Sequence, residues 1–445
     1  MTKKRSALAN TSVFVIFSLV LLVPAHQAIF AATMGRTNLA NAKLGLFVHY
    51  VFGLTEAAPG KPPLKNVNRF ADDLNVNGIA NMASAMGAQY VIFTAYHWRM
   101  TMLFPSRVWG GIFPNHVSHR DVISALAAAL KAKGIALVLY VHPDDRHDFP
   151  LPMLNKLVRL GWTSRRDVQY CLRGREPHDP KWNRLYYRIL NEIGRRYGTK
   201  ISGYFEDDWG GGSNGNTVRQ IMLRYTPHAA IWVNGFRAGP PATLIGGEDW
   251  TLFNHNPAPQ LYPTTSHMLA VVVTGNWGVW WAAKGHLNYT PQAMYRFFIC
   301  SIATRGNHNG GVVYATSPFS NNQWEPGVRK GLAELGRFIK SRARSIYNTV
   351  PSRAYVSGDS IAQKPDWGVA VDSINGKTVY LHVLIPPKGR VLQIGRPADH
   401  VKFSSARLLN GRFLAISRSR GGYKLTLPAG VKWSAVDTVI ALRVK

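Results

Sequence analysis

Short apolar runs alternate with amphipathic segments along most of the chain, up to about residue 350. The runs carry Val, Ile, Leu, Phe and Tyr at successive positions, which is typical of parallel strands buried on both faces. They lie at Leu44–Tyr50, Tyr90–Ala95, Ile135–His142, Ile201–Glu206, Ala229–Asn234, Leu269–Thr274 and Val312–Ala315. Helical apolar spacing between the runs predicts helices at Asn75–Met86, Asp121–Lys133, Lys181–Tyr197 and Glu325–Arg344.

This alternation predicts an α/β fold with a parallel sheet. Seven or eight strand–helix units favour a (β/α)8-type barrel over residues 41–350, with an open doubly wound sheet as the alternative.

After Pro351 the helical spacing stops, and short alternating runs are separated by turn signals such as Asn375-Gly376. The runs lie at Trp367–Val371, Thr378–Ile385, Val391–Ile394, Phe413–Arg418, Tyr423–Leu427 and Val439–Val444. They predict a C-terminal β-sandwich over residues 351–445.

The first 32 residues have the layout of a secretory signal peptide. Lys3–Arg5 form a positive start, an apolar run extends over Val13–Val23, and small residues follow. Because this run is too short to span a bilayer comfortably, we expect cleavage near Ala31 or Ala32. The sequence therefore predicts export to the periplasm or the extracellular space, with an uncleaved N-terminal anchor as the alternative.

Composition and charge narrow the function classes. The chain has 445 residues, of which 46% are hydrophobic and 17% charged, and this excludes a disordered protein. It carries 53 Lys and Arg against 23 Asp and Glu, a net charge of +30. Because the basic residues are scattered along the chain, we expect contact with anionic surfaces and no nucleic-acid-binding groove. An alternative function is that of an adhesion protein for acidic polymers. Two cysteines exclude a disulfide scaffold, and the spacing leaves the pairing of Cys171 and Cys300 open.

Polar residues end most of the predicted strands, where a (β/α)8 barrel carries its active site. They are His49, His97, His142 with the nearby Asp144 and Asp145, Glu206–Asp208, Asn234–Arg237 and Glu248. Carboxylates with aromatic rings suit sugars, because one acid can attack the anomeric carbon while another protonates the leaving oxygen. The chain lacks a His-Glu-x-x-His motif, a P-loop and a Gly-x-Ser-x-Gly elbow, so we expect no metal and no cofactor.

From about Lys43 to the C-terminus, the chain resembles the α-L-fucosidases of glycoside hydrolase family twenty-nine. The likeness is carried by Lys43–Tyr50, Gly87–His97, Leu139-Tyr140, Tyr204–Trp209, Val233–Arg237, Gly275–Gly278 and Asn309–Tyr314. It implies retaining hydrolysis of terminal α-L-fucosyl or closely related residues of a glycan or glycoside. Neither nucleic acid nor stable membrane insertion after signal cleavage is expected, and the oligomeric state is open.

The resemblance also implies roles for individual residues. It places Glu206 where the family has its nucleophilic aspartate, with Asp207 as the alternative, and it places Glu248 where some members carry the acid/base. Substrate-binding residues implied by the family motifs are His49, His97, Trp98, Tyr140, Tyr204, Arg237 and Trp277. Trp98 stands where the family usually has a second histidine, and Glu206 where it has an aspartate. Together these departures predict a different sugar specificity or a catalytically inactive carbohydrate-binding barrel.

Overall fold

The computed structural model describes residues 36–175, 178–207, 213–248, 267–274, 280–304, 310–357 and 365–445. The predicted signal peptide and Trp277 lie outside these residues. Among the helices in the described ranges, none has the length and apolar character needed to cross a membrane.

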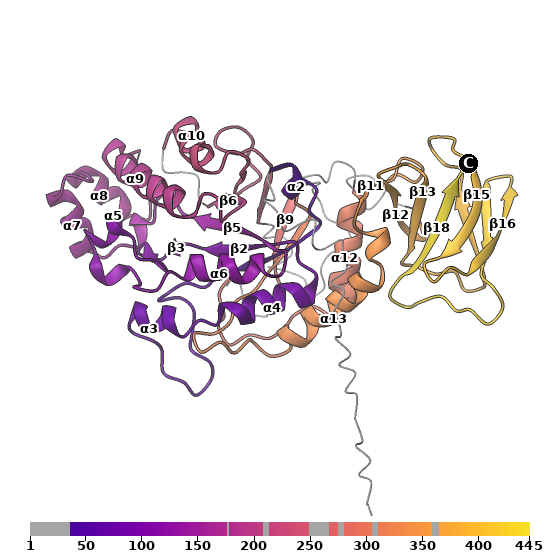
Figure 1. Ribbon diagram of the computed structural model, residues 1–445, viewed down its shortest axis with the longest axis horizontal. Coiled ribbons are helices and arrows are strands. Elements are labelled where there is room, and N and C mark those ends of the chain that lie inside the picture. Colours follow the sequence, from indigo (N-terminus) through magenta and orange to yellow (C-terminus); the bar gives the residue numbers. More distant parts are fainter. Residues whose placement is uncertain are drawn as a thin grey trace, which may run out of the picture.

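Eight parallel strands form the first sheet, in the order β7-β6-β5-β2-β1-β10-β9-β8 (Figure 1). Their bounds are β1 Leu44–Val48, β2 Tyr90–Thr94, β5 Ala136–Val141, β6 Gly203–Glu206, β7 Ala230–Val233, β8 Gly246–Glu248, β9 Met268–Val272 and β10 Val312–Ala315. The two ends of the sheet meet, because the Phe236 backbone N–H after β7 donates to the Gly246 carbonyl of β8 at 3.1 Å. The sheet is therefore a nearly closed barrel, which confirms the predicted (β/α)8-type architecture.

Helices surround this barrel and connect its strands (Figure 1). Their bounds are α2 Arg36–Ala40, α3 Val67–Asp72, α4 Val76–Met86, α5 Arg107–Gly110, α6 Val122–Lys131, α7 Leu151–Arg159, α8 Arg165–Cys171, α9 Pro180–Tyr197, α10 Gly215–Tyr225, α12 Pro291–Ala303 and α13 Val328–Ser341. A short hairpin of β3 Tyr96–His97 and β4 Thr101–Met102 follows β2. The side chains of Asp121 and Asp179 accept backbone N–H bonds at the starts of α6 and α9, which satisfies donors that a helix leaves unpaired.

Alternate residues of each barrel strand face the barrel interior and the surrounding helices. On β6, Phe205 packs in the interior together with Tyr140 and Trp232. Its neighbour Tyr204 packs in the outer layer, where Tyr186 of α9 also lies. This alternation decides which residues at the strand ends can reach the mouth of the barrel.

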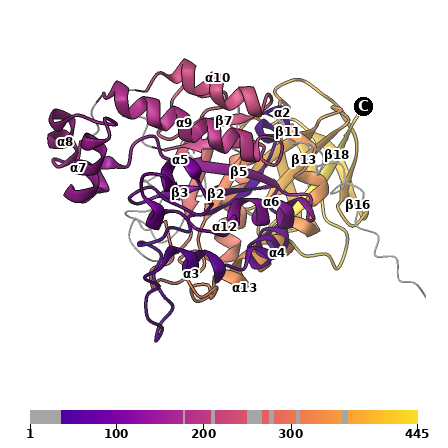
Figure 2. The same cartoon turned by 60° about the vertical axis from the view of Figure 1, so that its left-hand side comes forward.

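A second sheet of eight antiparallel strands follows, in the order β11-β12-β13-β18-β15-β16-β17-β14. Their bounds are β11 Thr349–Pro351, β12 Gly368–Ser373, β13 Thr378–Val383, β14 Val391–Gly395, β15 Phe403–Leu408, β16 Phe413–Ser419, β17 Gly422–Thr426 and β18 Thr438–Val444. It bends around its own apolar core, with Trp367, Leu381 and Leu425 among its members, and this confirms the predicted β-sandwich. Figure 1 places α12 between this sheet and the rest of the barrel, and in both views α7 and α8 lie at the end away from the sheet (Figures 1 and 2).

Candidate active site

Asp207 follows β6 directly and lies at the mouth of the barrel. One carboxylate oxygen accepts a hydrogen bond of 2.5 Å from the Tyr140 hydroxyl, and the other accepts one of 2.6 Å from the Asn234 side-chain amide. Tyr140 belongs to the interior cluster, so the Asp207 side chain is directed toward the barrel axis. Two donors from neighbouring strand ends therefore fix the orientation of this carboxylate.

Glu248 ends β8 and is tied to the same site through Asn234. Its backbone N–H donates to the Asn234 side-chain oxygen at 2.9 Å, while the amide nitrogen of Asn234 holds Asp207. Burial raises the pKa of Tyr140 well above its ordinary value, and the charges of Asp207 and Glu248 raise it further. Asn234 therefore joins the ends of β6, β7 and β8, a role that the family likeness of Val233–Arg237 did not indicate.

Glu206 points away from this mouth, into the layer between β6 and α9. It is completely buried, and one of its oxygens accepts a hydrogen bond of 2.5 Å from the Tyr186 hydroxyl. Burial raises the pKa of Glu206 to about 8, against the opposing effects of the Tyr186 bond and of His142. Tyr204 lies on the same side of the strand, and burial raises its pKa to about 12. The structure therefore does not bring Glu206 and Tyr204 to the barrel mouth.

Rings line the mouth on the side of β1 and β2. The Nδ1 atom of His49 lies 2.7 Å from the Thr94 hydroxyl, and its ring meets that of Tyr140 edge-on at 4.8 Å. Trp281, which is not among the predicted substrate-binding residues, stacks on His49 with the ring centres 6.0 Å apart. Burial, together with His97 and His142, lowers the pKa of His49 well below its ordinary value, so its imidazole is neutral.

Of three further predicted substrate-binding residues, Trp98 and Arg237 are described by the structure and Trp277 lies outside the described residues. Trp98 is half-buried, has a left-handed backbone with φ of 44°, and packs on Gly53, where an added Cβ would lie 2.8 Å from its ring. Arg237 is exposed on the turn after β7. Trp98 directly follows His97, whose ring centre lies 5.3 Å from that of His49. Of these three residues, Trp98 is therefore the one that the structure places next to the ring-lined mouth.

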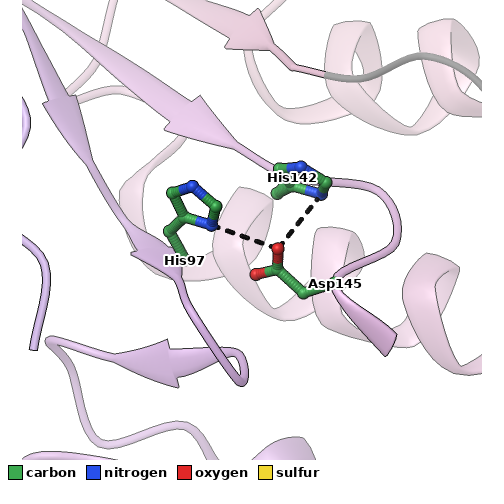
Figure 3. A group of neighbouring side chains, drawn as sticks. All are labelled: His97, His142 and Asp145. Carbon is green, nitrogen blue, oxygen red and sulfur yellow. Dashed lines mark hydrogen bonds and ion pairs between the residues drawn. The ribbon is translucent and has the colours of Figure 1, made fainter. Parts of the chain in front are cut away.

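His97, His142 and Asp145 form a compact group beside the mouth, which we call the histidine–aspartate cluster (Figure 3). Asp145 Oδ1 lies 3.1 Å from His97 Nδ1 and 3.5 Å from His142 Nδ1. The imidazole rings are stacked 5.1 Å apart with an interplanar angle of 17°. Burial alone would raise the pKa of Asp145, but the fields of His142 and His97 outweigh it and hold this pKa below the usual range.

The chain is similar to known α-L-fucosidases in its sequence profile and in its structure. A sequence profile of the family described as Alpha-L-fucosidase matches residues 67–340. A search of curated protein sequences finds no match. An α-L-fucosidase from Bacteroides thetaiotaomicron has a similar structure, with a TM-score of 0.65 and 17% identity over 95% of both chains.

Two further structures show the same fold. The Bacteroides thetaiotaomicron enzyme described as a trapped covalent intermediate with 2-fluoro-fucosyl fluoride has a TM-score of 0.66 and 17% identity, over 94% of this chain and 99% of that one. An α-fucosidase from Thermotoga maritima has a TM-score of 0.63 and 14% identity, over 92% of this chain and 97% of that one.

Proposed function

Because this chain belongs to the alpha-L-fucosidase family of glycoside hydrolases, we propose that it removes terminal α-L-fucosyl or closely related residues from glycans by a retaining mechanism. The observation that carries the proposal is the carboxylate of Asp207 at the barrel mouth, connected through Asn234 to Glu248. The covalent intermediate described for the Bacteroides thetaiotaomicron relative supports the retaining course. We assign Asp207 as the nucleophile in place of Glu206.

In the first step, an Asp207 oxygen attacks the anomeric carbon while the bond to the leaving oxygen breaks. The Glu248 carboxyl gives its proton to that leaving oxygen, and a glycosyl–Asp207 ester remains. In the second step, the Glu248 carboxylate takes a proton from water as the water oxygen attacks the anomeric carbon. The bond to Asp207 breaks as the bond to water forms, and both carboxyl groups regain their starting states.

The remaining mouth residues suit the recognition of one sugar ring. The rings of His49 and Trp281 lie face to face, and their neighbour Tyr140 closes the wall at a right angle. Aromatic faces pack against the apolar faces of a sugar, and imidazole nitrogens exchange hydrogen bonds with its hydroxyls. His97 and Trp98 complete the rim, with Trp98 contributing apolar surface where the family usually offers a second histidine.

The test is hydrolysis of 4-nitrophenyl α-L-fucoside by the full mature chain, by two isosteric variants and by an Asp207→Gly variant. Asp207→Asn removes the attacking charge, so kcat falls by about a thousandfold or more. In the Asp207→Gly variant, added azide takes the place of the missing nucleophile and restores the release of nitrophenol. Glu206→Gln is the matched control and changes kcat by less than about tenfold, because Glu206 does not face the substrate.

Loss of activity in Glu206→Gln with retained activity in Asp207→Asn would overturn the assignment of the nucleophile. Sugar binding without turnover of any aryl glycoside would instead make the barrel a carbohydrate-binding protein.

Export is proposed from the N-terminal sequence pattern, and N-terminal sequencing of the exported protein should find a start just after Ala31 or Ala32.

A further inference from the structure

The histidine–aspartate cluster has the composition and spacing of a metal site. The ligand-type atoms of His97, His142 and Asp145 all lie within 4.8 Å of one another. An ion held at about 2.0 Å by a tetrahedral set of nitrogen and oxygen ligands separates those ligands by about 3.3 Å. The separations from Asp145 Oδ1 to the two Nδ1 atoms are 3.1 and 3.5 Å, which bracket that value.

The three ligands come from two well-anchored segments. His97 belongs to β3, His142 follows β5, and Asp145 lies on the loop after β5 with its carboxylate directed between the two rings (Figure 3). Asp145 and His142 are almost completely buried, and the His97 side chain is 15% exposed. A preformed and enclosed set of ligands binds an ion without having to order flexible side chains first.

The carboxylate of Asp145 is incompletely satisfied by the protein. Its Oδ2 atom is buried and accepts no hydrogen bond from the residues that the structure describes, while Oδ1 faces both histidines. A buried charge with a free oxygen is costly unless it is paired or coordinates an ion. A divalent cation would neutralise this charge and engage both imidazoles at once.

We propose that His97 Nδ1, His142 Nδ1 and the Asp145 carboxylate bind one divalent transition-metal ion of the Zn²⁺ type. Two nitrogens and one oxygen suit zinc or cobalt, whereas Ca²⁺ and Mg²⁺ prefer sets made of oxygen alone. Local motifs in the sequence did not predict this site, because β4, α5, α6 and β5 all lie between His97 and His142 in the chain. Coordination through Nδ1 leaves His97 Nε2 for a sugar hydroxyl, so the ion fixes the direction of that ring.

The site would hold three protein ligands and one open position, which a water molecule would fill. A second group of ligand-type atoms, from Asp145, His147 and Asp148, lies on the same loop and shares Asp145. The proposal concerns ion binding and holds whether or not the barrel hydrolyses fucosides. Failure of one can therefore be told from failure of the other.

The experiment titrates Zn²⁺ into the full mature chain, prepared without a histidine tag and stripped with a chelator, using calorimetry. One equivalent should bind, and the same site loaded with Co²⁺ should show the visible absorption of a four-coordinate ion. His142→Gln and Asp145→Asn should each weaken binding by about 100-fold or more. His119→Gln is the matched control, because His119 is exposed, pairs with Asp72 at 3.0 Å on the surface, and should leave the titration unchanged.

Absence of saturable binding by the wild-type chain would overturn the proposal. Equal affinities in the wild type, His142→Gln and Asp145→Asn would also overturn it, because the ion would then bind elsewhere. Circular dichroism shows whether the variants fold. If the variants do not fold, the Co²⁺ spectrum of the wild-type chain tests the proposal instead. The absorption of a six-coordinate ion would contradict an enclosed, four-coordinate site.

Discussion

Glu206 and Asp207 are adjacent in the chain, but the geometry of an extended strand sends their side chains to opposite faces. Asp207 accepts two hydrogen bonds at the mouth, whereas Glu206 is enclosed between β6 and α9, where it accepts a hydrogen bond from the Tyr186 hydroxyl. A carboxyl group removed from water favours its neutral form, and this is why the pKa of Glu206 is raised to about 8.

This raised pKa predicts a particular dependence of stability on pH. Between the ordinary value of 4.5 and about 8, the folded chain keeps a proton on Glu206 that the unfolded chain has released. The stabilisation from this site is therefore fully present below about pH 4.5 and is lost as the pH rises through about 8. The slope contributed by one such group reaches at most about 1.4 kcal/mol per pH unit.

We expect the free energy of unfolding of Glu206→Gln, measured by urea denaturation, to vary less between about pH 5 and pH 8 than that of the wild type. Glutamine has the shape of the neutral carboxyl and cannot ionise. Glu334→Gln, at a partly exposed position on α13, is the control and should keep the wild-type slope. Parallel pH curves for the wild type and Glu206→Gln would show that Glu206 does not titrate in this way.

Sequence reasoning could locate the acidic segment but could not choose the acid. The alternation along β6 is clear, since Tyr204 and Glu206 share one face, and Phe205 and Asp207 the other. Both faces of a parallel barrel strand are buried, however, so hydrophobicity does not tell the interior face from the helix-facing one. Only the packing of Phe205 with Tyr140 in the barrel interior settles it.

At the scale of elements, the loop after β5 is held in place by Arg146. Its guanidinium is completely buried, donates to both oxygens of Asp144, and also donates to Asp179 at 2.6 Å. Asp179 in turn caps α9, and the guanidinium lies 4.6 Å from the centre of the Trp182 ring. This arrangement connects α9 to the loop that carries part of the histidine–aspartate cluster.

We expect Arg146→Met to lower the free energy of unfolding by about 3–5 kcal/mol, because two buried carboxylates lose their partner. Arg188→Met is the matched control on α9, because Arg188 is exposed and its guanidinium packs 5.3 Å from the centre of the Trp162 ring. This substitution should lower the free energy of unfolding by less than about 1 kcal/mol. Urea denaturation followed by tryptophan fluorescence measures both. A loss for Arg146→Met no greater than for Arg188→Met would contradict this role.

The elements that the sequence predicted best are those with strong periodic patterns. The run at Val312–Ala315 matches β10, and the predicted helix Asn75–Met86 matches α4 apart from its capping residue. Strand β8, Gly246–Glu248, was missed because two of its three residues are glycines, which give no apolar signal. Its place is set by the parallel pairing with β9, a contact that sequence spacing does not contain.

At the scale of the whole molecule, the barrel and the C-terminal sheet share a buried polar junction. Asp437 lies just before β18, accepts a hydrogen bond of 2.7 Å from Tyr295 of α12, and lies 2.7 Å from His382 of β13. Arg342, which follows α13, approaches the same carboxylate at 3.4 Å. Composition and periodicity predict two regions, but they carry no information on this junction, because its members are distant in sequence.

The junction predicts how the two regions unfold. Asp437 is 2% exposed, so Asp437→Ala leaves the buried His382 and the partly buried Arg342 without their carboxylate. We expect the free energy of unfolding to fall by about 3 kcal/mol or more. In differential scanning calorimetry, the single unfolding transition should separate into two, because the sheet no longer stabilises the barrel. Asp399→Ala, at an exposed position before β15, is the control and should unfold like the wild type. A single transition at the wild-type temperature in Asp437→Ala would mean that apolar packing alone couples the regions.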